Sequence, residues 1–236
     1  GIKLFNTGAN LSANASDANA LDKKPANVIP IYEKAVQEEV DAVVKELEDA
    51  KSALKAPFVN PFEDVSKNEW YYDAVMWGAE NQIVAGLTET MFYPAANCTR
   101  AQIVSFLWRA EGRPQPVYTE TTFEDIKADQ WYYKAVLWAT ENNIVSGYTK
   151  EIFAPDATCT RAEMATFIWR MEGRTVPSGT VNPFMDIPEG QWYTNSAKWT
   201  YENGIVSGYD VDGGKAFAPD NTIARAETVT MLYRYY

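Results

Sequence analysis

Three arginines recur at one position of a repeated pattern, each at the start of an expected helix. Arg100, Arg161 and Arg225 stand in the segments Thr-Arg-Ala-Gln, Thr-Arg-Ala-Glu and Ala-Arg-Ala-Glu. A guanidinium in the first helical turn lies beside unpaired backbone N–H groups and the positive end of the helix dipole. Because its donors form a fork that fits a carboxylate, this arrangement predicts an anion site. An ion pair that holds neighbouring repeats together is the open alternative.

Aromatic and acidic side chains recur with the same period. Trp70, Trp131 and Trp192 lie 61 residues apart, next to polar or acidic loops. Tryptophan offers a flat apolar face on which a sugar ring can pack, and a carboxylate accepts hydrogen bonds from sugar hydroxyls. These residue types therefore favour a binding surface for a carbohydrate. The alternative for the tryptophans is a place in the hydrophobic core.

A threefold internal repeat positions these side chains. The copies cover residues of about 60–114, 121–175 and 181–236, and before residue 60 there is no arginine or tryptophan. The third copy carries three extra residues within 210–214, because Arg161 and Arg225 are 64 residues apart. This Asp- and Gly-rich insertion predicts a surface turn. We expect a boundary near residue 59 between two parts of the chain.

Each copy predicts a helix, a loop and a second helix. The first helix is expected to begin near Trp70 and to end before Gly86, which suits a left-handed turn. The second begins after Thr99 with a capping box, and Ala224 removes half of that box in the third copy, at a cost of about 1 kcal/mol. Two short amphipathic helices cannot bury both their apolar faces alone, so the copies must stack on one another.

Composition excludes several classes of function. The chain has 236 residues, a net charge of −11, two cysteines and no histidine. Nucleic-acid binding is not expected because phosphate contacts need a basic surface. Catalysis by a Ser-His-Asp or Cys-His arrangement is excluded, and we expect no metal site and no cofactor. No apolar run of about 18 residues is present, so membrane insertion is not expected.

The order of motifs resembles the S-layer homology domain. The resemblance rests on the motifs Phe-x-Asp, Trp-Tyr, Trp-Ala-x-Glu-Asn-x-Ile-Val-x-Gly, Phe-x-Pro and Thr-Arg-Ala-Glu, in this order. It covers residues 60–236. The resemblance implies an all-α fold, in which three repeats close into a spindle of pseudo-threefold symmetry. It also implies a non-catalytic module outside the cell that anchors a bacterial surface protein to a cell-wall polysaccharide, commonly a pyruvylated one. The three arginines, with Gln102, Glu163 and Glu227, correspond to its Thr-Arg-Ala-Glu motif.

The predicted glycan contacts extend to residues that each have a structural alternative. Three aspartates stand where a helix-entry loop would be capped, and three glycines stand where a positive φ would be needed. Together with the arginines and their motif partners, the candidates are Trp70, Trp131, Trp192, Asp64, Asp125, Asp186, Gly86, Gly147 and Gly208.

The chain before residue 60 has a different character. Residues 1–26 are rich in Asn, Ala and Ser and are expected to be irregular, whereas 30–55 predict one helix. Val36, Val40, Val43 and Leu47 form an apolar stripe along that helix. This stripe needs a partner helix, either from the same chain or from another one. Cys98 and Cys159 share one repeat position with Ile223, which predicts a small buried apolar site and no disulfide.

Two other functions stay open at this point. One is a carbohydrate-active enzyme that uses paired carboxylates. The other is a module that self-associates into a surface lattice through the N-terminal helix. The threefold repetition favours multivalent binding over a single reaction centre.

Overall fold

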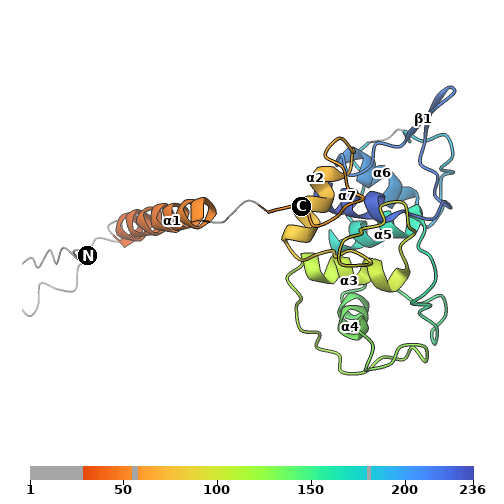
Figure 1. Cartoon of the computed structure of the whole chain (residues 1–236), viewed down its shortest axis with the longest axis horizontal. Helices are drawn as coiled ribbons and strands as arrows, with labels where there is room; N and C mark the ends of the chain where they lie inside the picture. The colour runs from red at the N-terminus through yellow and green to blue at the C-terminus, as the bar shows by residue number, and fades with distance from the viewer. Residues whose placement is uncertain (1–28, 55–57, 180–181) are drawn as a thin grey trace, which may run out of the picture. The chain divides into compact units, whose positions relative to one another are not determined.

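The computed structural model describes residues 29–54, 58–179 and 182–236. The chain divides into two compact units between Pro57 and Phe58. Figure 1 shows a single helix in the first unit and a cluster of short helices in the second. Among the described residues, no helix is both long and apolar enough to cross a membrane.

The first unit contains helix α1, Ile29–Leu54, where the sequence predicts a helix over 30–55. The apolar stripe of this helix is exposed, with Val43 and Leu47 exposing 64% and 69% of their surface. The i,i+4 pairs Lys34–Glu38 and Lys45–Asp49 support the helix from its polar face. That another helix packs on this apolar stripe stays a prediction.

The second unit is built from helix pairs, one pair in each repeat. The helices are α2 (Tyr72–Glu80) and α3 (Arg100–Ala110), α4 (Tyr133–Glu141) and α5 (Arg161–Met171), and α6 (Thr194–Glu202) and α7 (Arg225–Tyr235). The three extra residues of the third copy lie within a hairpin of strands β1 (Tyr209–Val211) and β2 (Gly214–Ala216). The predicted all-α class is confirmed, with this hairpin as a local addition.

The helix starts follow the local capping chemistry. Thr99 and Thr160 each close a capping box at the start of α3 and α5, as predicted. Ala224 provides no side-chain cap, but Glu227 still accepts a hydrogen bond from the Ala224 amide at 3.0 Å. The first helices begin two residues later than predicted, because hydrogen-bonded turns hold the chain up to Tyr72 (Tyr72 N to Glu69 O, 3.0 Å).

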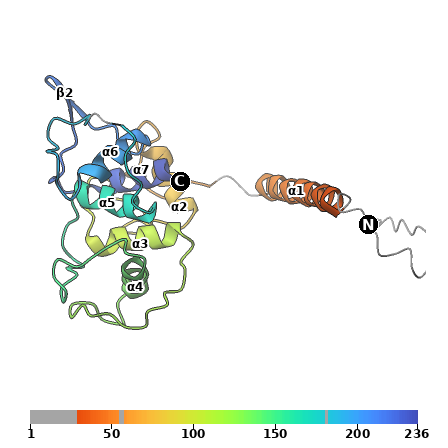
Figure 2. The same ribbon diagram turned by 180° about the vertical axis from the view of Figure 1, so that it is seen from behind.

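Contacts between the repeats form a closed cycle. Helix α3 packs on α4, α5 on α6, and α7 on α2, and both views show these pairs side by side (Figure 1, Figure 2). Three main-chain hydrogen bonds follow the same order: Cys159 N–H to Cys98 O, Ile223 N–H to Cys159 O, and Cys98 N–H to Ile223 O, at 2.9, 2.9 and 3.0 Å. The third repeat therefore contacts the first. The pseudo-threefold symmetry stays a prediction that this cycle supports.

Both cysteines take part in this cycle of main-chain hydrogen bonds. Both are fully buried and both are free thiols, as the sequence predicts. Burial raises the pKa of each thiol above its ordinary value. The cysteines therefore occupy the buried apolar position that Ile223 fills in the third repeat.

Candidate functional site

Each repeat inserts its motif arginine into the next repeat, and we call each of these junctions a seam. Arg100 forms the repeat 1–2 seam, Arg161 the repeat 2–3 seam and Arg225 the repeat 3–1 seam. In each seam the arginine Nε donates to the carbonyl of a buried phenylalanine: Arg100 to Phe153 at 3.0 Å, Arg161 to Phe217 at 2.9 Å, and Arg225 to Phe92 at 2.9 Å.

The arginines are buried, and two of them are paired with a carboxylate. Arg100 Nη1 lies 2.6 Å from Glu163 and Arg161 Nη1 lies 2.7 Å from Glu227. The exposed fraction is 2% for Arg100 and Arg225 and 6% for Arg161. The inter-repeat ion pair, which the sequence left as an alternative, is thus present in two seams. Contact of these arginines with a ligand stays a prediction.

The repeat 2–3 seam has an open cavity beside its ion pair. The cavity has a volume of about 320 Å³ and brings together side chains from all three repeats. Trp70 comes from the first repeat, Arg161 from the second, and Gly208 and Glu227 from the third. The cavity is therefore lined by one predicted glycan contact of each of four residue types: tryptophan, arginine, glycine and glutamate. The rest of its wall consists of Ile205, Val206, Ser207, Tyr209, Thr230, Met231 and Arg234.

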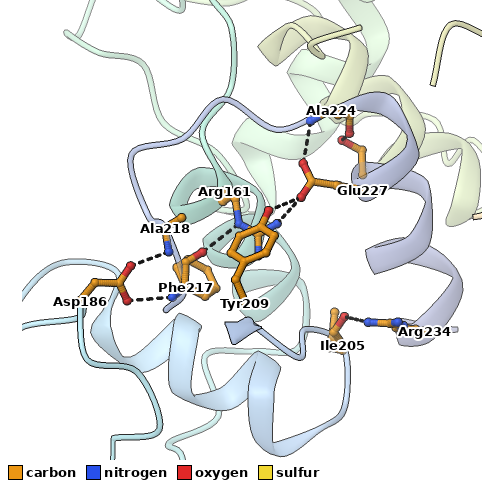
Figure 3. Close-up of polar contacts among 10 residues, drawn as sticks. Arg161, Asp186, Ile205, Tyr209, Phe217, Ala218, Ala224, Glu227 and Arg234 are labelled. Carbon is orange, nitrogen blue, oxygen red and sulfur yellow. Dashed lines mark hydrogen bonds and ion pairs between the residues drawn. The ribbon is translucent and has the colours of Figure 1, made fainter. Parts of the chain in front are cut away.

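Glu227 is the centre of the polar contacts in this seam (Figure 3). Its Oε1 accepts from Arg161 Nη1 at 2.7 Å and from the Tyr209 hydroxyl at 2.6 Å, and its Oε2 accepts from the Ala224 amide at 3.0 Å. Burial and the bond to Glu227 raise the pKa of Tyr209 to about 12, so its hydroxyl stays protonated and donates. The guanidinium carbon of Arg161 lies 4.7 Å from the centre of the Tyr209 ring. The seam thus combines a fixed charge pair with an aromatic wall.

The sequence did not single out Tyr209 or Arg234 as ligand candidates. Tyr209 follows the candidate Gly208 directly, and Arg234 recurs as Arg109 and Arg170 in the last turn of the other two second helices. Arg234 Nη1 donates to the Ile205 carbonyl at 3.3 Å, in the loop after α6 (Figure 3). An arginine occurs at this position in all three repeats, and this recurrence was the signal in the sequence that could have identified Arg234 as a residue of the cavity.

The three tryptophan candidates are exposed, unlike the next tryptophans along the chain. Trp70, Trp131 and Trp192 expose 63%, 58% and 58% of their surface, whereas Trp138 exposes 7%. Each exposed ring packs edge-on against the tyrosine that follows it, with centroids 5.1 to 5.2 Å apart. An aromatic face held in this way can pack on a sugar ring without a large loss of side-chain entropy.

Each of the three glycine candidates lines a cavity. The prediction that glycine is needed there for a positive φ is wrong at two of them. Gly86 and Gly147 do not have a positive φ; Gly208 does, at +70°. A Cβ at Gly147 would lie 2.4 Å from the Thr149 carbonyl oxygen and 2.5 Å from that of Ile152. Close approach of the backbone therefore requires glycine there. The left-handed residue after the first helix is Gln82 in the first repeat.

The three aspartates each hold the extended segment before the second helix. Asp64, Asp125 and Asp186 use both carboxylate oxygens to accept from two consecutive amides, at 2.6 to 2.9 Å. The carbonyl of the first amide residue accepts the arginine Nε in the seam. The aspartates thus fix the loop on which each seam is built, a structural role that differs from the predicted capping of the helix-entry loop, because no side chain caps the first helices.

Replacing Asp125 with asparagine is expected to lower the free energy of unfolding by about 2 kcal/mol. An amide offers one oxygen to the Phe153 and Ala154 amides, and its NH2 group would oppose the second donor. Urea denaturation followed by circular dichroism measures the change. The exposed Asp129→Asn substitution in the same repeat is the matched control. Equal stability of both variants would contradict this role.

Metal binding finds no support in the described part of the chain. Residues 29–54, 58–179 and 182–236 contain no group of three or more His, Cys, Asp or Glu side chains that could hold an ion.

Comparison with known proteins identifies the same three repeats. The family model described as "S-layer homology domain" matches residues 61–104, 122–165 and 183–229. Three relatives come from Acetivibrio thermocellus. They are cell surface glycoprotein 1 (29% identical, 66% of this chain, 7% of that protein), exoglucanase XynX (32%, 53% and 11%) and a cellulosome-anchoring protein (27%, 64% and 34%). The chain matches no more than about a third of the length of any of these relatives.

Proposed function

Since this chain belongs to the S-layer homology domain family, we propose that it is a non-catalytic module that anchors a bacterial surface protein to the cell wall. It acts outside the cell, where its seams bind a wall polysaccharide that carries a ketal-linked pyruvate. A surface protein and a cellulosome-anchoring protein among its relatives support this location and role.

The cavity of the repeat 2–3 seam carries the proposal. Trp70 and Tyr209 offer aromatic faces for a sugar ring, while Arg161 and Arg234 bring positive charge to the same cavity. Because Glu227 offsets one of these charges, the cavity keeps a net positive charge within an acidic protein. Local charge of this kind attracts an acidic glycan in spite of the overall balance.

The enzyme relatives do not favour catalysis by this chain. Exoglucanase XynX is matched over 11% of its length, so most of that enzyme lies outside the similarity. In this chain, Glu163 and Glu227, the carboxylates that pair with seam arginines, are engaged in ion pairs and backbone hydrogen bonds. A glycosidase needs a carboxylic acid and a carboxylate that are free to exchange protons with the substrate.

The test is co-sedimentation of the chain with purified cell walls, before and after chemical removal of pyruvate. We expect binding to the native walls and its loss after depyruvylation. Unchanged binding to depyruvylated walls would contradict the proposed ligand, and release of sugars from the walls would favour an enzyme.

Trp70→Ala tests the seam itself. Because the ring is exposed, we expect the variant to fold normally and to bind walls about fivefold more weakly, as expected for loss of one aromatic contact of about 1 kcal/mol. Val176→Ala, at another highly exposed apolar side chain, is the matched control. Wall binding equal to that of the control would exclude Trp70 as a contact residue.

A further inference from the structure

We propose that each of the first two repeats binds a phosphate group between two arginines, Arg109 with Arg113 and Arg170 with Arg174. The two members of a pair belong to the same repeat, and none of them is a motif arginine of a seam. The inference goes beyond the proposed function, because it names a second kind of site and a different charged group. It can therefore be tested separately from the binding of a pyruvylated glycan.

Both arginines of the first pair donate to the loop that follows α2. Arg109 Nη1 donates to the Ile83 carbonyl at 3.3 Å, and Arg113 Nη2 donates to the Gln82 carbonyl at 2.8 Å. These carbonyls belong to consecutive residues, whose Cα atoms are about 3.8 Å apart. The two guanidinium groups are thus held close together on one short stretch of backbone.

The second repeat has the same arrangement. Arg170 Nη1 donates to the Ile144 carbonyl at 3.2 Å, and Arg174 Nη2 donates to the Asn143 carbonyl at 3.3 Å. All four positions lie 61 residues after their counterparts in the first repeat. The arginine pair is therefore a feature of the repeat unit and not a single accidental contact.

The backbone presents the second arginine of each pair in a fixed and strained conformation. The φ angle is +60° at Arg113 and +62° at Arg174. This left-handed region costs a residue with a Cβ about 1–2 kcal/mol. Trp108 holds Arg113 there from both sides, because its carbonyl accepts from the Arg113 amide at 2.9 Å and its Nε1 donates to the Pro114 carbonyl at 2.8 Å. Strained residues that are held in this way cluster at ligand clamps.

The positive charge of the pairs is not compensated by an ion pair. Within residues 29–54, 58–179 and 182–236, none of the four arginines pairs with a carboxylate, although the chain has 32 acidic residues. Burial and the positive charge of Arg113 lower the pKa of Arg109, and burial with the charges of Arg174 and Arg100 lowers that of Arg170. An anion between the two guanidinium groups removes this repulsion.

The half-buried arginine of each pair borders a cavity that gives a ligand room. Arg109 lines a cavity of about 680 Å³, and Arg170 lines one of about 430 Å³. One carboxylate lines each cavity, Glu89 in the first and Glu111 in the second. Glu111 accepts a hydrogen bond from the Tyr236 hydroxyl, and neither carboxylate forms an ion pair in the described part of the chain. The cavities thus keep the positive charge of the arginines accessible.

A phosphate group fits two adjacent guanidinium groups better than a carboxylate does. The carbonyl bonds use one N–H of each guanidinium, so several N–H groups of each described pair remain for a ligand. One guanidinium fork binds two oxygens of a phosphate, and the tetrahedral group offers further oxygens to the second fork. A carboxylate is satisfied by one arginine, so it gains less from the pair.

The experiment is a titration of the full chain with inorganic phosphate at constant ionic strength, followed by the NMR signals of the arginine side-chain N–H groups. We expect the Arg113 and Arg174 signals to shift, and Arg113→Gln combined with Arg174→Gln to weaken binding about tenfold. Glutamine accepts the left-handed conformation, as Gln82 shows with a φ of +56°. Lys67→Gln combined with Lys150→Gln, at exposed positions of the same repeats, makes the same change of net charge and should leave the affinity unchanged.

Two further comparisons can overturn the inference. Acetate should bind about tenfold more weakly than phosphate, because it lacks oxygens for the second guanidinium. Arg113→Lys combined with Arg174→Lys keeps the charge without the fork and should lose most of the affinity. Equal binding of phosphate and acetate, or equal affinity of the lysine variant and the wild type, would overturn the inference. Since this titration uses no cell walls, such a failure leaves the proposed function intact.

A glycerol phosphate oligomer and phosphatidylglycerol vesicles identify the carrier of the phosphate group. Binding of the oligomer that the double glutamine variant loses assigns the site to a polymer. Binding of the vesicles that the variant loses assigns it to a membrane surface. Binding of both carriers that the variant retains would overturn the inference.

Discussion

Replacing Arg100 with alanine is expected to lower the free energy of unfolding by about 3–5 kcal/mol. The guanidinium pairs with Glu163 at 2.6 Å and donates to the carbonyls of Phe153 and Ser146. Its removal leaves a buried carboxylate without its cationic partner and two carbonyls without a donor, across the junction of two repeats. Urea denaturation measures the change, and its midpoint should fall accordingly.

Two further variants separate the charge effect from the loss of packing. Arg100→Ala combined with Glu163→Gln removes the unpaired carboxylate and should recover part of the lost stability. Arg225→Ala removes an equally buried guanidinium from the seam in which Gln102 stands in place of glutamate, so it should cost less than Arg100→Ala. Equal losses for Arg100→Ala and Arg225→Ala would show that the ion pair adds nothing beyond packing and carbonyl contacts.

Replacing Gly147 with alanine is expected to lower the free energy of unfolding by about 3 kcal/mol. The added Cβ would lie 2.4 and 2.5 Å from two carbonyl oxygens and 2.5 Å from the ring of Phe123. None of these atoms is the end of a flexible side chain, so the loop that carries Tyr148 must move. Thermal unfolding followed by circular dichroism measures the loss as a lower Tm.

Gly173→Ala is the matched control for this prediction. A Cβ at Gly173 meets no atom within 4 Å, but its φ is +77°. That variant therefore carries only the conformational cost of a left-handed alanine, about 1–2 kcal/mol. A loss at Gly147 no larger than that at Gly173 would contradict the steric argument.

Much of the local structure follows from interactions between residues close in sequence. The capping boxes at Thr99 and Thr160 join residues three positions apart, so the starts of α3 and α5 are readable from the chain. The 61-residue period shows that one unit occurs three times, and the Gly-containing insertion after Asp210 indicates the turn of the hairpin. By contrast, the beginning of α2 was placed too early, since non-helical turns before Tyr72 contain no residue that forbids a helix.

The repeat, its helices and the residue types at each seam can be read from the amino-acid sequence, because these depend on short-range chemistry and on periodicity. The contacts that each of these residues makes in a seam depend on the packing of the repeats. Arg100 meets Glu163 from 63 positions away, and Arg225 meets Phe92 from 133 positions away, so their partners depend on which repeat packs against which. Likewise, Gly147 is glycine because of a close backbone contact that no local pattern encodes.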